Sequence, residues 1–225
     1  MKRLILIVVV SIIACSLCMS CYNDPRFTYS GYNDPRFTHS GYEISAGMTS
    51  GFKEFTWEND IAYFSFEYKS TYKIDKLNTY VFKEDNDRAD ESCCVELIGP
   101  NDTRINIHVF PNNQFPECFT DAQSRVNYIV ERALRFGDVD ILEQSDVTIS
   151  GIPGTLLVTE EVDWTRGIVG IYKGQKYKSQ PKCIIREVNL DHKNQIWMIT
   201  IDSMSSAAEK DKADFEHLLD TLKIY

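Results

Sequence analysis

The chain has 225 residues, of which 43% are hydrophobic and 12% aromatic, and its net charge is −9. This composition excludes a disordered chain and predicts one packed domain of about 170 residues behind an N-terminal segment. The negative charge argues against nucleic acid as a partner and against broad contact with anionic lipid heads, and it suits cationic partners.

Residues 1–21 have the layout of a secretory signal. A basic start at 1–3 precedes an uncharged apolar run at 4–14, and three cysteines follow it, Cys15, Cys18 and Cys21. The run is shorter than the roughly 18–20 residues that cross a bilayer as a helix, so export with cleavage is favoured over an uncleaved anchor. Removal of the signal takes away Lys2 and Arg3 and no acid, which lowers the net charge from −9 to −11.

The end of this segment supplies a candidate lipidation site. Ile12-Ile13-Ala14-Cys15 resembles the lipobox of bacterial lipoproteins. The resemblance implies that the Cys15 thiol receives a diacylglyceryl group and that the signal is cut just before it. Cys21 is the alternative, because Ser20 before it is small and the signal would have a more usual length, but Cys18 stands where the family has Leu, Val or Ile. We favour Cys15 as the membrane anchor.

The same cysteines admit a second interpretation. Cys15-x-x-Cys18-x-x-Cys21 has the spacing of part of an iron–sulfur ligand run. A fourth cysteine and a closing proline are missing, and an apolar signal cannot supply the supporting hydrogen bonds that such a site needs. We therefore expect a lipid anchor and no cofactor.

Residues 22–51 read as a tether. The ten residues from Tyr22 to Gly31 repeat at 32–41 with one change, Tyr29 to His39. Two copies are too few for a repeat fold, and each contains Asn-Asp-Pro and Ser-Gly breakers. We expect a spacer spanning roughly 30 Å; a tandem docking peptide built on its Tyr, Arg and Phe side chains is the alternative.

From residue 52 to 225 the pattern predicts a globular domain of short strands and two helices. A hairpin is expected over 52–57 and 61–68 and another over 95–98 and 105–110, and later strands are expected at 147–149, 155–160, 168–172, 183–188 and 196–201. Thr120 to Gln123 and Ser206 to Glu209 read as capping boxes that begin two helices, of which the first ends at Gly137. The fold class is α+β, a mostly antiparallel sheet with helices packed against it.

Three short motifs connect this domain to a known superfamily. Residues 64–68, 147–154 and 215–224 resemble the Mog1/PsbP-like proteins, although Lys69 stands where many members have proline. The resemblance implies a sandwich of antiparallel sheet and helices that binds or helps to assemble another protein, with no catalytic residues to carry over.

Candidate chemistry is sparse. The domain cysteines, Cys93, Cys94, Cys118 and Cys183, permit disulfides or buried free thiols. Cys93 and Cys94 would point to opposite faces of a strand, so we do not expect them to pair with each other. His108 alternates with Ile107 and Val109, so we expect it to face solvent; a Cys118–His108 nucleophile pair is conceivable.

Two charged segments complete the candidates. The acidic run at 84–91 offers Asp85, Asp87 and Asp90 as weak ligands for a hard cation, but it lacks the spacing of an EF-hand, and we expect no metal site. The basic, aromatic run at 172–182 reads as an exposed hairpin loop, with contact to an acidic partner or membrane as the alternative.

These features predict an exported protein held by its lipid on the outer face of the cell membrane. Its domain is expected to be a non-catalytic module that binds another envelope protein. The alternative is a thiol-active or hydrolytic envelope enzyme using Cys118 or Cys93/Cys94.

Overall fold

The structure is a computed structural model that describes residues 42–43, 51–83, 89–112, 119–137, 139–162 and 182–225, with side chains from 78 to 91 left aside. All of them belong to one compact unit, His39–Tyr225. The signal and lipobox at 1–21, the duplicated segment at 22–41 and the expected strand at 168–172 lie outside the described residues.

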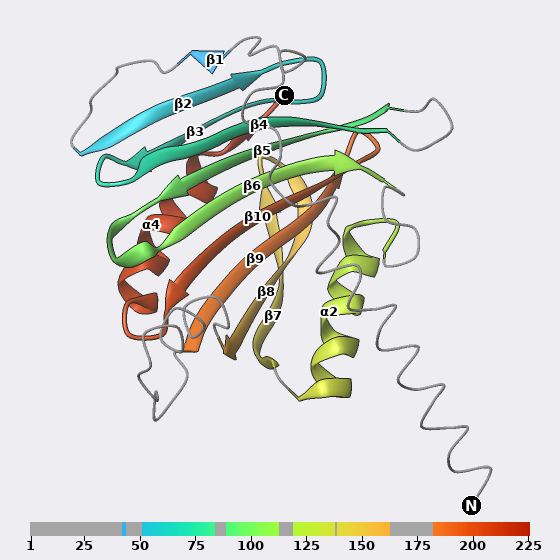
Figure 1. The fold of residues 1–225 in the computed structure, drawn as a ribbon, viewed down its shortest axis with the longest axis vertical. Helices are drawn as coiled ribbons and strands as arrows, with labels where there is room; N and C mark the ends of the chain where they lie inside the picture. Colours follow the sequence, from blue (N-terminus) through green and yellow to red (C-terminus); the bar gives the residue numbers. More distant parts are fainter. Residues whose placement is uncertain (1–41, 44–50, 84–88, 113–118, 138, 163–181) are drawn as a thin grey trace, which may run out of the picture. The chain divides into compact units, whose positions relative to one another are not determined.

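Seven strands form the larger sheet, in the order β4-β5-β6-β10-β9-β8-β7 (Figure 1). Every strand pairing of the described residues is antiparallel. The strands are β4 (Lys73–Lys83), β5 (Ala89–Ile98), β6 (Arg104–Pro111), β7 (Val139–Ile149), β8 (Ile152–Val162), β9 (Lys182–His192) and β10 (Gln195–Met204). A short 3-10 turn, η2 (Pro100–Asp102), joins β5 to β6.

Two of the hairpins in the larger sheet close with two-residue turns whose backbone twist matches that of the strands. Ser150 and Gly151 between β7 and β8 both have positive φ, at 52° and 80°, as do Lys193 and Asn194 between β9 and β10. Such turns twist in the same sense as the strands they join, which is why they are the commonest short hairpin connections. They fix the register of β7 against β8 and of β9 against β10.

The smaller sheet has the order β1-β2-β3-β11 and packs on one face of the larger one. Its strands are β1 (Tyr42–Glu43), β2 (Phe52–Glu58), β3 (Tyr63–Lys69) and β11 (Lys223–Ile224). β2 and β3 form the hairpin expected from residues 52–68. The chain therefore brings its C-terminus back to pair with the beginning of the domain.

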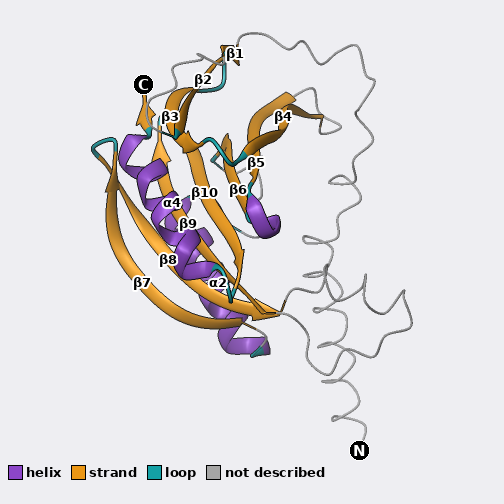
Figure 2. Cartoon of the chain, turned by 90° about the vertical axis from the view of Figure 1, so that its left-hand side faces the viewer, coloured by secondary structure: helices purple, strands orange, loops and turns teal. Residues whose placement is uncertain are grey.

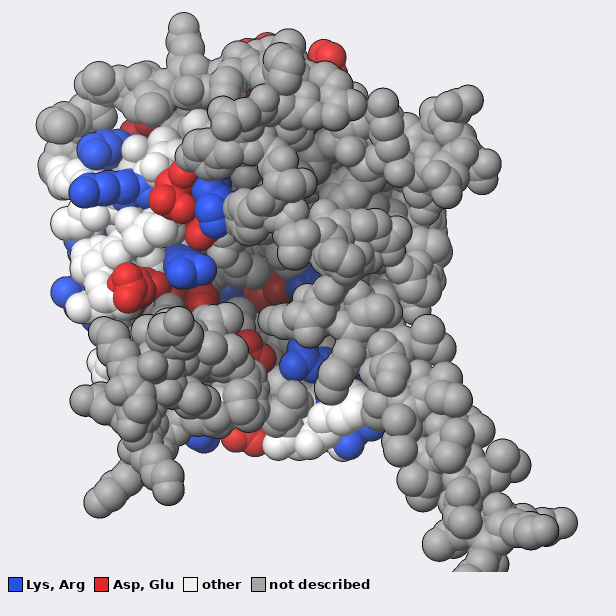
Figure 3. All heavy atoms as spheres, viewed as in Figure 1, with Lys and Arg blue, Asp and Glu red and all other residues white. Residues whose placement is uncertain are grey.

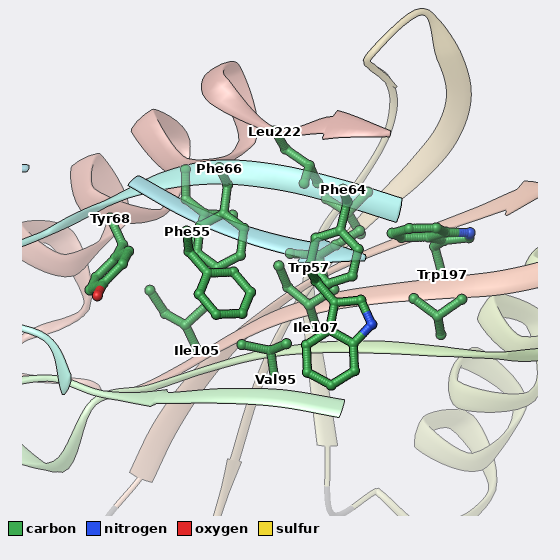
Figure 4. Close-up of a cluster of buried hydrophobic side chains, with 14 of the residues drawn as sticks. Phe55, Trp57, Phe64, Phe66, Tyr68, Val95, Ile105, Ile107, Trp197 and Leu222 are labelled. Atoms are coloured by element: carbon green, nitrogen blue, oxygen red, sulfur yellow. The ribbon is translucent and has the colours of Figure 1, made fainter. Parts of the chain in front are cut away.

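An aromatic cluster fills the space between the two sheets (Figure 4). Phe55, Phe64 and Phe66 from the smaller sheet are at most 1% exposed, and the Phe64 ring meets Trp197 of β10 edge-on with centroids 5.4 Å apart. Aromatic side chains bury large areas and prefer such tilted contacts, so this cluster dominates the burial that holds the sheets together.

Two helices complete the described part of the domain, α2 (Ala122–Phe136) and α4 (Ala208–Thr221) (Figure 2). Helix α4 contacts β3 and buries Phe215 and Leu218 in the aromatic cluster. Helix α2 contacts β7, β8 and β9 and places Ala122 against Phe110 and Ile196, which lie outside that cluster. The two helices thus serve different clusters of side chains.

Both predicted helix starts need correction. The N-cap of α2 is Asp121, whose side chain accepts the Ser124 N–H while the Ser124 hydroxyl accepts the Asp121 N–H, so the capping box lies one residue beyond Thr120. The N-cap of α4 is Ala207, which has no side chain to accept a bond, so the expected box at Ser206 is not formed. Gly137 does end α2 in the left-handed conformation, with φ 64°.

The observed fold agrees with the coarse prediction of a mostly antiparallel sheet with helices packed against it. Strand β4 was not expected from the sequence. The strands that were expected are longer than predicted, since β7 begins at Val139 rather than 147 and β9 continues to His192.

Candidate functional site

The larger sheet has a second face, turned away from the aromatic cluster. It carries the polar side chains of Glu96, His108 and Glu187 as well as a few apolar ones. Strand β10 shows the alternation: Trp197 and Ile199 lie in the aromatic cluster, whereas Ile196 and Met198 belong to the cluster at the start of α2. Side chains directly opposite each other on neighbouring strands share a face. His108 of β6 is opposite Met198, so it lies on the α2 side of the sheet.

A cysteine and a histidine meet on this face. Cys94 of β5 is opposite His108, and its Sγ lies 3.3 Å from His108 Nε2. Cys94 is 4% exposed, and His108 is partly buried. The prediction that His108 is exposed to solvent is therefore wrong. The side chain does lie on the predicted face of the strand, opposite to that of the buried Ile107 and Val109.

The ionisation of this pair argues against a catalytic nucleophile. Burial, together with the nearby Arg125 guanidinium, lowers the pKa of His108 to about 4, against the effect of Glu187. Burial and the Glu96 carboxylate raise the pKa of the Cys94 thiol to about 12. At neutral pH both groups are uncharged, whereas a reactive cysteine needs the thiolate.

Beside the pair, helix α2 is held to the sheet by a largely buried ion pair. Arg125 donates from Nε and Nη2 to the two carboxylate oxygens of Glu187, at 3.1 and 2.9 Å. Asn189 accepts a second bond from Nε at 3.1 Å and donates to Glu187 at 2.8 Å. Two-pronged contacts of this kind fix the orientation of the guanidinium as well as its charge.

The start of α2 is positioned by the end of β9. The Ala122 N–H donates to the Asp191 carboxylate at 3.1 Å, which supplements the bond that the Asp121 cap receives from Ser124. Hydrogen bonds from Ser124 lower the pKa of Asp121, whereas burial raises the pKa of Asp191. Carboxylates at a helix N-terminus are stabilised by its unpaired N–H groups and dipole. This anchoring places Arg125 over the polar face.

The lowered pKa of His108 predicts acid sensitivity. Because its folded pKa is near 4 and its ordinary value 6.5, the unfolded chain binds more protons between these values. Stability conferred by the neutral imidazole is fully present above pH 6.5 and is lost as the pH falls toward 4, by about 3 kcal/mol. Denaturation at several pH values should show a shallower loss for His108→Gln than for the parent, and equal slopes would contradict the burial of a neutral imidazole.

A second surface feature is apolar and exposed. Around the junction of α2 and β7, four large hydrophobic side chains face solvent: Leu134 at 81% exposure, Phe136, Ile141 and Leu142. They lie between 134 and 142, and α2 packs on β7. Register across the strands shifts between Ile141 and Glu143, so Leu142 lies in a bulge of β7, which forms one end of the larger sheet. Exposed apolar groups mark interaction surfaces where they adjoin one another.

Charges are mixed over the rest of the surface in view. Figure 3 shows basic and acidic side chains interspersed over the described surface, with neither sign forming a continuous field. The exposed charged contacts, such as Lys182 with Glu160, are local pairs. The expected basic loop lies mostly at 163–181, outside the described residues.

Some of the predicted site residues lie within the described part of the chain, and others lie outside it. Cys93 and Cys94 are buried free thiols, and the buried Cys183 Sγ lies 3.6 Å from the Glu161 carbonyl oxygen. The lipidation candidates Cys15 and Cys21, together with Cys118, Asp85 and Asp87, lie outside the described residues, and Asp90 is placed only as part of β5. Within the described ranges, no three His, Cys, Asp or Glu side chains are grouped to hold a metal ion.

The Cys94–His108 contact was missed by sequence reasoning, which paired His108 with Cys118. Residues 94 and 108 meet because the turn at η2 sets the register of β5 against β6. The signal that could have revealed the Cys94–His108 contact is the turn Gly99-Pro100-Asn101-Asp102. Pairing residues outward from this turn on both strands brings 94 near 108.

No known protein family and no curated protein sequence matches this chain. Among solved structures, it is similar to the cyanobacterial PsbP protein (CyanoP) from Synechocystis sp. PCC 6803, with 9% identity, a TM-score of 0.46, and coverage of 81% of this chain and 98% of the other. It is also similar to a Pseudomonas aeruginosa protein of unknown function, with 10% identity, a TM-score of 0.38, and coverage of 72% and 91%. No helix within the described ranges is long and apolar enough to span a membrane.

Proposed function

We propose that this chain is an exported lipoprotein whose α+β domain is a non-catalytic module that binds or helps to assemble another envelope protein. The observation that carries the proposal is the exposed apolar patch formed by Leu134, Phe136, Ile141 and Leu142. A monomeric domain gains nothing by leaving Leu134 81% exposed close in sequence to three further exposed large apolar side chains. Burying them against a partner would remove this apolar area from water.

The anchor and tether follow from the N-terminal sequence. Cys15, with Cys21 as the alternative, would carry the lipid, and the part of the 22–51 segment that precedes β1 would hold the domain away from the membrane surface. The three motifs at 64–68, 147–154 and 215–224 support a Mog1/PsbP-like sandwich as the finer description of the fold. The net charge of −9 makes nucleic acid an unsuitable partner.

Thiol chemistry at Cys93 or Cys94 is the less favoured function. The Cys94 thiol and the His108 imidazole are both neutral at pH 7, and burial raises the pKa of Cys93 as well. A hydrolase or thiol enzyme would need the opposite arrangement, a thiolate beside an imidazolium.

The patch is tested by placing a photo-cross-linking amino acid at position 134 in intact cells. We expect one discrete adduct with an envelope protein, and we expect Leu134→Asp to abolish co-purification of that protein. Because Leu134 is 81% exposed, the substitution should change stability by no more than about 0.5 kcal/mol.

The matched control carries the same cross-linker at Glu216, an exposed position on α4. The patch account predicts that Glu216 yields no comparable adduct. An adduct of equal yield from both positions, or none from position 134, would contradict the binding role of the patch.

A further inference from the structure

Three side chains that can bind copper lie in one row on the polar face of the larger sheet. Cys94 of β5 is opposite His108 of β6, and His108 is opposite Met198 of β10. The three residues therefore occupy one row across three adjacent strands and share one face. The proposed binding role does not use this row, although Met198 also packs near Ala122 at the start of α2.

Two of the potential ligand atoms in the row, Cys94 Sγ and His108 Nε2, already lie close together. Cys94 Sγ lies 3.3 Å from His108 Nε2, so one nitrogen and one sulfur are directed at each other. Met198 is partly buried and packs beside Phe110, Ala122 and Ile196, which leaves its thioether near the edge of an apolar cluster. His108 is also partly buried, so two of the three side chains keep some contact with solvent, whereas Cys94 is buried.

The chemistry of the three side chains selects the metal. Thiolate and thioether sulfur are ligands for Cu(I), and imidazole suits copper as well. Zinc prefers four ligands drawn from Cys, His, Asp and Glu, and no cluster of three such side chains occurs in the described part of the chain. Two carboxylates on this face already have basic partners: Glu96 is held by Lys76 at 2.9 Å, and Glu187 by Arg125 at 2.9 Å.

We propose that Cys94, His108 and Met198 form a three-ligand site for Cu(I). On binding, Cys94 Sγ loses one proton to solvent and bonds to the metal, His108 Nε2 donates its lone pair, and Met198 Sδ supplies the third bond, with no change in oxidation state. The thiolate and the monovalent cation together are neutral, so the bound site adds no net charge beside the ion pair of Arg125 with Glu187. A neutral site suits a partly buried position between sheet and helix.

The site is tested on the full chain in detergent with Cys15, Cys18, Cys21 and Cys118 replaced by serine, because those thiols would compete for the metal. Cu(I) is supplied as its bathocuproine disulfonate complex, and transfer to the protein is followed by loss of the colour of that complex. We expect one Cu(I) per chain, one proton released per metal, and an X-ray absorption spectrum with sulfur and nitrogen neighbours.

Single substitutions in that background assign the ligands. Cys94→Ser and His108→Gln should weaken binding by more than the roughly 10- to 100-fold that loss of a supporting partner costs, and Met198→Leu by about tenfold. Cys93→Ser, adjacent in sequence but on the opposite face, and Cys183→Ser should leave the affinity unchanged. Circular dichroism confirms that each variant folds.

The proposal is overturned if the serine background takes no Cu(I) from the competitor. It is equally overturned if folded Met198→Leu and His108→Gln bind as tightly as the background, or if Cys93→Ser weakens binding as much as Cys94→Ser.

Discussion

Replacing Arg125 by methionine should destabilise the domain by about 3 kcal/mol, because it leaves the Glu187 carboxylate buried without its cation. The two side chains are only 17% and 9% exposed, and the guanidinium supplies both of the short bonds to the carboxylate. Asn189 alone cannot replace a charge. The loss is measured by urea denaturation, with fluorescence of the buried Trp57 and Trp197 as the probe.

Two further variants test whether the stability is lost because the Glu187 carboxylate stays buried without a cation or because the contacts of the Arg125 side chain are missing. In Arg125→Met/Glu187→Met the buried carboxylate is gone, so much of the lost stability should return. Lys212→Met breaks the exposed Lys212–Glu216 pair, whose side chains are 45% and 58% exposed, and should cost less than about 0.5 kcal/mol. A double variant as unstable as the single one would show that packing, rather than charge, holds α2 to the sheet.

Replacing Phe66 by alanine should cost about 3–5 kcal/mol and lower the melting temperature by about 10 °C. The Phe66 ring is 1% exposed and lies with its centroid 5.2 Å from that of Phe55 and 6.2 Å from that of Phe64. Its loss opens a cavity where the two sheets meet, and the neighbouring rings cannot close it without leaving their own contacts. Thermal unfolding followed by near-ultraviolet circular dichroism measures the change.

The matched control is Tyr63→Ala in the same strand. Tyr63 is 40% exposed and stacks on Tyr225 with ring centroids 4.2 Å apart, so its removal should cost no more than about 1 kcal/mol. Equal losses from Phe66 and Tyr63 would mean that the aromatic cluster is not the main source of stability.

The residue pattern was sufficient to predict the coarse fold class and the hairpin β2–β3. The hairpin at 52–68 was predicted from its many β-forming residues, and the structure shows that Phe55, Phe64 and Phe66 within it are fully buried. Strand β4 was missed since its sequence, KIDKLNTYVFK, mixes charged and apolar residues without regular alternation. The pattern of residue types alone therefore finds strands rich in β-forming residues. It overlooks a strand of mixed composition such as β4, which lies at one edge of the larger sheet.

The errors at the helix starts have a local cause. Thr120 and Asp121 can both accept an N–H bond, and the choice of Asp121 depends on Ser124 three residues later and on Asp191, which reaches Ala122 from β9. The second contact joins residues 69 positions apart, so the sequence around the helix does not contain it. The Cys94–His108 contact escaped notice for a related reason, because it depends on the register of two strands.

The most direct test of the account is metabolic labelling of the full chain with a radioactive fatty acid such as palmitate. The account predicts a labelled, membrane-bound protein, and loss of both label and membrane attachment in Cys15→Ser; loss only in Cys21→Ser would move the anchor to the alternative cysteine. Cys18→Ser is the matched control and should keep the label. Label that survives in both Cys15→Ser and Cys21→Ser, or an unlabelled parent chain, would contradict the proposal that this protein is a lipoprotein.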